Sequence, residues 1–116
     1  MRNDTENVIV NKSFQFALDI VEFCELLEEN KKFIVAKQLL RAGTAIGASI
    51  REAQNAESKA DFIHKLKIAA KEADEVEYWL MICKYSKNYP FNDSLLDSVK
   101  EIIKILSKII STSKNS

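Results

Sequence analysis

The sequence predicts an all-α protein that folds as one antiparallel up-down-up-down four-helix bundle over residues 1–116. Apolar residues recur at helical spacing in four separate stretches, and no stretch alternates with period two for the length of a sheet strand. The chain contains one Pro and two Gly, which suits long helices joined by short turns. Because short connections make consecutive helices antiparallel neighbours, the four stretches are expected to pack as a bundle.

The first predicted helix covers residues 13–29 and carries two apolar stripes side by side. One stripe consists of Phe14, Ala17, Leu18, Val21 and Cys24, and the other of Phe16, Ile20, Phe23 and Leu27. Two stripes present more apolar surface than one neighbouring helix can cover, so we expect this helix to contact several partners. Residues 8–10 are predicted to be at most an extended lead-in.

Three further helices are predicted over residues 33–56, 59–87 and 93–111. In the last two, apolar residues advance in alternating steps of four and three, which is typical of helices packed nearly parallel to their neighbours. Ser58 is predicted to cap the third helix, with Asp61 three positions on as its acidic partner. Asn92 or Asp93 is expected to cap the fourth helix.

The two glycines, Gly43 and Gly47, both fall inside the second helix and share one face. Each costs about 1 kcal/mol relative to Ala in an exposed helix, a penalty that close helix packing can offset through added dispersion contacts. If the third helix returns antiparallel, Gly47 and Gly43 are expected to face the positions near Ile68 and Glu72. A local kink, or simple tolerance of the glycines, is the alternative.

Two motifs resemble a known family. Residues 38–53 read QLLRAGTAIGASIREA, and residues 58–69 read SKADFIHKLKIA, followed by KEA at 71–73 and EYWL at 77–80. Together they are similar to the motifs QLLRSGTSIGANIxEA and SxxDFIxKLxIAxKEAxExxYWL of the 23S ribosomal RNA intervening-sequence proteins, over residues 12–110. Ala42 stands where Ser is usual, and Ser49 stands where Asn is usual.

The resemblance implies an antiparallel four-helix bundle that forms a ring-like homopentamer. It also implies a gene history tied to insertions in large-subunit ribosomal RNA, so ribosomal RNA is the partner that it suggests besides the chain itself. It brings no established biochemical activity. The basic accessory bundle of diversity-generating retroelements is a relative, and this chain departs from it because 17 basic residues balance 17 acidic ones.

Composition and motifs argue against catalysis, a cofactor, a metal or a small-molecule substrate. His64 is the one histidine, whereas di-iron bundles need two Glu-x-x-His pairs. Cys24 and Cys83 lie in apolar stripes without a Cys-x-x-Cys motif and are predicted to be reduced core thiols. No membrane-length apolar run and no signal-peptide core are present, so a cytoplasmic location is expected.

Basic side chains provide the nucleic-acid alternative, in which a patch on the second and third helices binds RNA phosphates. This patch comprises Arg51, Lys65, Lys67, Lys71, Lys37 and Arg41. The competing interpretation is ion pairing within the bundle, with Arg41 near Asp74 or Glu75. The same residues therefore serve either an RNA-binding accessory module or a self-associating scaffold.

A predicted subunit interface consists of apolar and aromatic residues outside the main seams, namely Tyr78, Ile82, Tyr85, Tyr89 and Ile105. The first four share a face of the third helix and the segment after it, where they can pack against another surface or stack on RNA bases. Ile105 points away from the main stripe of the fourth helix. The sequence thus predicts a non-catalytic, self-assembling bundle, with a weak RNA- or ribosome-related role left open.

Overall fold

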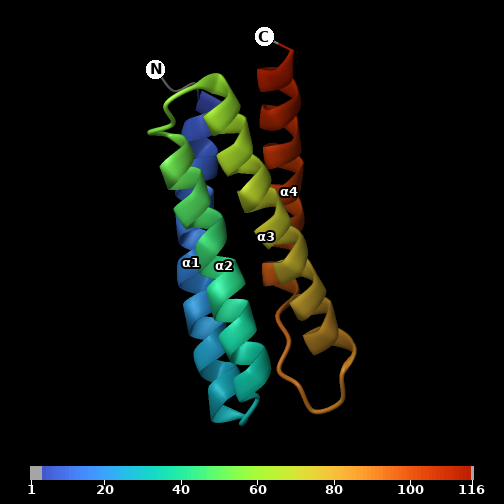
Figure 1. The fold of residues 1–116 in the computed structure, drawn as a ribbon. Helices are drawn as coiled ribbons and strands as arrows, with labels where there is room; N and C mark the ends of the chain where they lie inside the picture. Colours follow the sequence, from blue (N-terminus) through green and yellow to red (C-terminus); the bar gives the residue numbers. More distant parts are fainter. Residues whose placement is uncertain (1–3, 116) are drawn as a thin grey trace.

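The computed structural model describes residues 4–115, with side chains from residue 8 onward. Four helices follow one another, α1 (Asp4–Glu29), α2 (Phe33–Ala53), α3 (Lys59–Tyr85) and α4 (Asp93–Lys114). Figure 1 shows that the chain runs down α1, up α2, down α3 and up α4, so both termini lie at the same end. The predicted all-α four-helix class is confirmed.

Each helix contacts its two neighbours around a square. The contacting pairs are α1 with α2, α2 with α3, α3 with α4, and α4 with α1, and within residues 4–115 the diagonal pairs do not approach one another. The result is a rod of 47 × 20 × 19 Å. A helix of this bundle therefore has one inward face, two flanks that contact neighbours, and one outer face.

The core consists of one inward stripe from each helix. The predicted seams of α3 and α4 are almost wholly buried, and Phe16, Ile20, Phe23 and Leu27 form the inward stripe of α1. Cys24 and Cys83 are also buried, as predicted, and both are free thiols. Periodicity therefore identified most of the core from the sequence.

Helix boundaries differ from the prediction at several ends. The chain is already helical from Asp4, so residues 8–10 belong to α1 and are not an extended lead-in. Ile9 explains this difference, because it is fully buried and continues the inward stripe of α1 by two turns. The second and third helices end at Ala53 and Tyr85, a few residues before the predicted 56 and 87, and α4 extends to Lys114.

Two helices begin at the predicted side-chain caps. The Ser58 hydroxyl accepts a hydrogen bond from the backbone N–H of Asp61 at 3.0 Å, and the Asp61 carboxylate accepts one from the N–H of Glu57 at 3.2 Å. For α4, the side-chain oxygen of Asn92 accepts from the N–H of Leu95 at 3.3 Å. Both caps satisfy donors that the first helical turn leaves unpaired.

None of the helices in residues 4–115 combines the length and the apolar character that crossing a bilayer requires.

Candidate functional site

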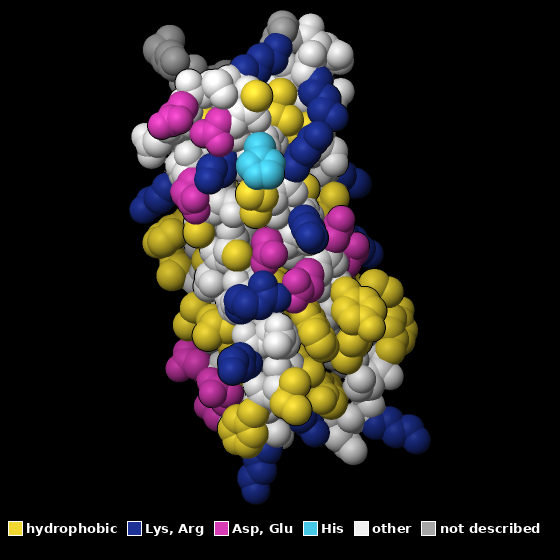
Figure 2. Space-filling model, viewed as in Figure 1, with side chains coloured by type: hydrophobic (Ala, Val, Ile, Leu, Met, Phe, Trp, Pro, Cys, Tyr) yellow, Lys and Arg dark blue, Asp and Glu magenta, His cyan; other side chains and the backbone are white. Residues whose placement is uncertain are grey.

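The outer surface of α1 and α2 carries an exposed apolar face. We define this α1/α2 face by its five large side chains, whose exposed fractions lie between 40% and 59%: Phe14, Leu18 and Val21 of α1, and Phe33 and Leu40 of α2. On α1 they follow one another by four and three residues, and on α2 they are seven residues apart, so each set lies along one side of its helix. Figure 2 shows hydrophobic side chains at the left edge of the molecule, over α1 and α2.

The two glycines bring α1 and α2 close together. A Cβ atom at Gly43 would lie 2.7 Å from Cγ2 of Ile20, and one at Gly47 would lie 3.3 Å from the carbonyl oxygen of Ser13. Both neighbours belong to α1, so the prediction that the glycines face Ile68 and Glu72 of α3 is wrong. Helical spacing placed the glycines on one face, but it could not determine which neighbour that face meets.

A shallow groove follows this close approach on the outer side. It has a volume of about 300 Å³, and its α2 wall is made of the small residues Thr44, Gly47 and Ala48 with Arg51 at one end. Phe14 and Ala17 form part of its α1 wall. Because small residues let the two helices approach, the α1/α2 face is a continuous surface and not two separate stripes.

A second apolar surface lies on the outside of α3. We define this α3 ridge by Tyr78, Met81 and Tyr85, which are 62%, 44% and 75% exposed and advance along α3 by three and four residues. Figure 2 shows hydrophobic side chains at the lower right, over this part of α3 and the loop after it. Met81 was missed by the sequence analysis, although its spacing from Tyr78 placed it on the same side of the helix.

The remaining predicted interface residues are less accessible. Ile82 is half-buried, while Tyr89 and Ile105 are half-buried and pack against the core. The Nζ atom of Lys32 lies 4.7 Å above the centre of the Tyr89 ring, which ties the α3–α4 loop to the α1–α2 turn. The expectation that Ile105 points away from the packed side of α4 is wrong, because Ile105 extends the core.

Two members of the predicted basic patch are engaged within the bundle. Arg41 Nη1 lies 3.1 Å from a carboxylate oxygen of Glu72, and its Nη2 bonds Glu75. Lys65 Nζ lies 3.5 Å from the carboxylate of Glu52. The predicted pairing of Arg41 with α3 is therefore present, with Glu72 in place of Asp74, because Glu72 lies on the α2 side of α3 and Asp74 on its exposed side.

The other four members, Lys37, Arg51, Lys67 and Lys71, are exposed and form no ion pair with the side chains of residues 8–115. The side chain of Lys114 of α4 approaches that of Lys67, and this contact and its like charge lower the pKa of the Lys67 ammonium. Figure 2 shows Lys and Arg side chains gathered over the upper parts of α3 and α4. The structure thus extends the unpaired part of the patch from α3 onto α4.

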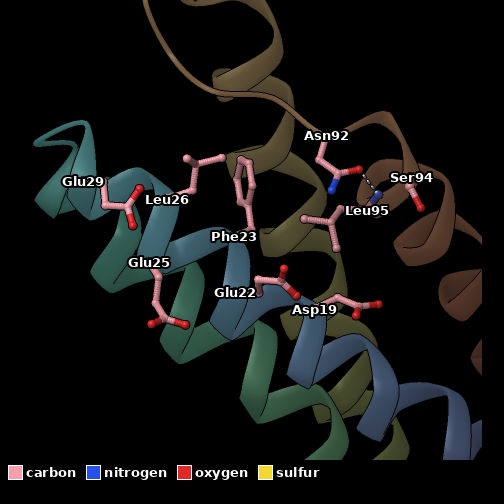
Figure 3. A pocket seen from close by; sticks show the side chains of 9 residues that line it. All are labelled: Asp19, Glu22, Phe23, Glu25, Leu26, Glu29, Asn92, Ser94 and Leu95. Atoms are coloured by element: carbon pink, nitrogen blue, oxygen red, sulfur yellow. Dashed lines mark hydrogen bonds between the residues drawn. The ribbon is translucent and has the colours of Figure 1, made fainter.

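An acidic cleft lies where α1 meets the start of α4. Its volume is about 560 Å³, and Asp19, Glu22, Glu25 and Glu29 line it beside Phe23, Leu26, Asn92, Ser94 and Leu95. Figure 3 shows that the four carboxylates all come from α1, and that α4 contributes its capping Asn92 and first turn. The N-terminus of α4 carries partial positive charge, and Figure 3 shows Asp19 and Glu22 on the side of the cleft toward it, with Glu25 and Glu29 farther away.

The thiols and the histidine do not gather into a reactive site. Burial raises the pKa of the Cys24 thiol to about 12, with Glu28 and Cys83 as smaller causes, and burial raises the pKa of Cys83 to about 11. Both thiols are therefore protonated at neutral pH. His64 is exposed on α3. Among the side chains that the structure describes, no group of three His, Cys, Asp or Glu residues could hold a metal ion.

Comparison with known proteins gives a family and a structural neighbour. Residues 5–111 match the family described as 23S rRNA-intervening sequence protein. A crystal structure of a protein of unknown function from the S23 ribosomal protein family of Bacteroides thetaiotaomicron is 45% identical, with a TM-score of 0.86. The similarity covers 92% of this chain and 98% of that one. No curated protein matches the chain.

Proposed function

The chain belongs to the family of 23S rRNA-intervening sequence proteins, and on that premise we propose that it is a non-catalytic cytoplasmic bundle that assembles with copies of itself. The observation that carries this proposal is the α1/α2 face. Five large apolar side chains stand open on two adjacent helices, although the core is already filled. A homopentameric ring, which the family resemblance implies, is the proposed assembly.

Burial of the α1/α2 face provides the driving force. Contiguous exposed apolar surface is unusual on a monomer and is typical of an interaction site. Full burial of one large apolar side chain contributes about 1.5–3 kcal/mol, and these five are roughly half exposed, so each still has about half of that to gain. The α3 ridge adds three further exposed side chains whose burial would also stabilise an assembly.

The absence of catalysis is supported by the state of the nucleophiles. A cysteine reacts as its thiolate, and the raised pKa values of Cys24 and Cys83 keep both protonated at neutral pH. Both are also buried inside the bundle. The side chains with reactive chemistry therefore act as core residues, and neither cofactor nor small-molecule substrate is part of the proposal.

Light scattering coupled to gel filtration tests the assembly. We expect a species of five times the 13.2 kDa subunit mass at micromolar concentration. A single 13.2 kDa species under the same conditions contradicts the proposal. Lys104→Ala is the matched control, because it alters the exposed polar side of α4 and should leave the mass unchanged.

A second function, binding to ribosomal RNA, is favoured by the unpaired cations on α3 and α4. Lys67 and Lys71 have no acidic partner among the described side chains, and Lys114 adds a third positive charge beside Lys67. A clustered positive charge of this kind binds phosphates with an affinity that falls steeply as salt rises.

Filter binding to ribosomal RNA fragments at two salt concentrations separates this function from a scaffold alone. We expect Lys67→Glu with Lys71→Glu to weaken binding and to reduce its salt dependence. The slope of the logarithm of the binding constant against the logarithm of the salt concentration should fall by about one for each phosphate that is no longer bound. Lys100→Glu with Lys104→Glu on α4 changes net charge equally and is the control. Equal binding by both double variants, or no binding at low salt, contradicts RNA recognition by this cluster.

A further inference from the structure

We propose that the assembly is heterologous, with the α3 ridge of one copy packed on the α1/α2 face of the next. This inference rests on the proposed self-assembly and adds which surfaces meet. The two surfaces lie on opposite flanks of the rod, so one molecule can use both at once (Figure 2). Two different patches on opposite flanks favour a chain of like contacts that closes as a ring over a two-fold dimer.

The ridge lies level with the α2 part of the face along the rod. Arg41 bonds Glu72 and Glu75, which places residue 41 of α2 beside this part of α3. From there α2 descends through Leu40 to Phe33, while α3 descends through Tyr78 to Tyr85, toward the end that carries both the α1–α2 turn and the α3–α4 loop (Figure 1). The ridge and the α2 part of the face therefore occupy the same half of the molecule, while Phe14 continues the face upward beside Thr44 and Ala48.

The α2 part of the face and the ridge also have the same length. Leu40 and Phe33 are seven residues apart in α2, as are Tyr78 and Tyr85 in α3, which corresponds to about 10 Å of helix in each case. On the α1 side, Val21 continues the face beside Leu40. Its neighbour Ile20 lies against Gly43, and Gly43 is one helical turn from Leu40. Copies that pair these surfaces stand side by side with little shift along the rod, which a closed ring requires and a helical filament lacks.

Charge supports the same pairing. Lys37 lies between Phe33 and Leu40 on the exposed side of α2, and Asp74 lies one turn before Tyr78 on the exposed side of α3. Neither has an ion-pair partner within the described side chains of its own molecule. Face-to-ridge packing places this cation and this anion of two copies along the same seam, about one helical turn apart along the rod by the register of Arg41 with Glu72 and Glu75. Attraction between them across the seam aids register and discourages wrong partners.

A mixing experiment tests the pairing. Leu40→Glu disables the face and leaves the ridge intact, whereas Tyr78→Glu with Tyr85→Glu disables the ridge and leaves the face intact. Each variant should remain at 13.2 kDa by light scattering and keep its helical circular dichroism. An equimolar mixture should give a species of twice that mass, because the intact ridge of one variant can bind the intact face of the other.

Three outcomes overturn the pairing. One is a variant that still assembles alone, since an intact surface would then pair with itself. Another is a mixture that stays at 13.2 kDa while the unmodified protein assembles, which leaves the proposed self-assembly in place through other surfaces. An unmodified protein that is itself 13.2 kDa removes the proposed function together with the pairing.

A charge exchange supplies a readout that loss of folding cannot imitate. Lys37→Asp and Asp74→Lys should each raise the subunit dissociation constant by about fivefold, the scale of an exposed ion pair. The variant with both changes should recover the original constant. No recovery in the double variant contradicts an attraction between these two residues across the seam.

Discussion

Helices α1 and α4 lie side by side in the bundle, yet their outer surfaces differ completely. Both bury one stripe, with Phe16, Ile20 and Leu27 on α1 and Val99, Ile102 and Leu106 on α4 among the residues in the core. Outside the core, α1 leaves large apolar side chains open, whereas α4 exposes none within 93–114. The inner stripes account for the fold of the chain, so the outer surface of α1 is apolar surface that the fold itself does not bury.

The two helices also differ in how they approach their neighbours. The first helix lies on the glycines of α2 so closely that Ile20 occupies the space of a Gly43 side chain. The last helix packs through ordinary apolar side chains on α3, and its contact with α1 leaves the acidic cleft beside Asn92. The α1–α2 seam is therefore the part of the bundle that tolerates added volume least.

The largest expected effect follows from that seam. Gly43→Leu should lower the free energy of unfolding by more than about 3 kcal/mol, the upper end of ordinary overpacking, because even its Cβ lies 2.7 Å from Ile20. Urea denaturation at a fixed protein concentration measures the change. Gly47→Ala is the matched control and should stay within about 1 kcal/mol, since its gain in helix propensity offsets a contact at 3.3 Å with Ser13. Equal effects would show that the seam is not specifically tight at Gly43.

The difference between the outer surfaces gives the next prediction. Leu18→Lys with Val21→Lys should raise the subunit dissociation constant of the proposed assembly by about 10- to 100-fold, because two half-exposed apolar side chains would no longer be buried between copies. Sedimentation equilibrium measures the constant. Lys104→Ser with Lys108→Ser on α4 should leave it unchanged. If the α4 variant dissociates as readily as the α1 variant, the comparison of the two helices fails.

The ionisation and reactivity of the two buried thiols test whether the inner side of α1 is inaccessible to solvent. Burial raises the folded-state pKa of Cys24 to about 12 and of Cys83 to about 11, against 9.0 for a free thiol. The stability that these thiols contribute is fully present below pH 9 and falls as pH rises from 9 toward 11 or 12, because the unfolded chain ionises first. Urea denaturation from pH 8 to 11 should show a smaller loss in Cys24→Ala with Cys83→Ala. A thiol reagent that modifies the folded protein at pH 8 would contradict the burial.

The smallest expected change in stability concerns the side-chain cap at the N-terminus of α4. Asn92→Ala should lower the free energy of unfolding by about 1 kcal/mol, because the N–H of Leu95 loses its acceptor at 3.3 Å. Asn92→Asp keeps that acceptor and should restore stability, as thermal denaturation can measure. A full loss in both variants would mean that the amide acts through another contact in the cleft.

Much of the fold was predictable because helical periodicity and capping are local. The seams of α3 and α4 and the caps at Ser58 and Asn92 follow from spacing of at most a few turns. The pairing of Arg41 with α3 joins residues more than 30 positions apart, and it followed from the expected antiparallel return of that helix. The start of α1 was missed because residues 8–10 read as a short apolar run, and burial of Ile9 against the rest of the bundle decides their helical state. The position of Ile105 was predicted wrongly because the width of the buried stripe on a helix depends on how its neighbouring helices are placed. In α4 that stripe is wide enough to include Ile105.

The candidate surfaces were predictable only in part for the same reason. Sequence showed that α1 carries two apolar stripes, and it marked Tyr78 and Tyr85 as outside the main seam of α3. It could not show that Phe14, Leu18 and Val21 would be the stripe left open, nor that Phe33 and Leu40 of α2 would continue it. Such a surface exists only once two helices lie side by side.

The amino-acid sequence by itself determined that four helices form and which residues of each share a side, because the geometry of one helix fixes those angles. Only the tertiary structure decided which side turns inward, that Gly43 and Gly47 lie against α1, and that the α2 part of the face stands level with the ridge. The physical reason is that the rotation of each helix about its own axis is set by the packing of all four together, and no single stretch of chain contains that information.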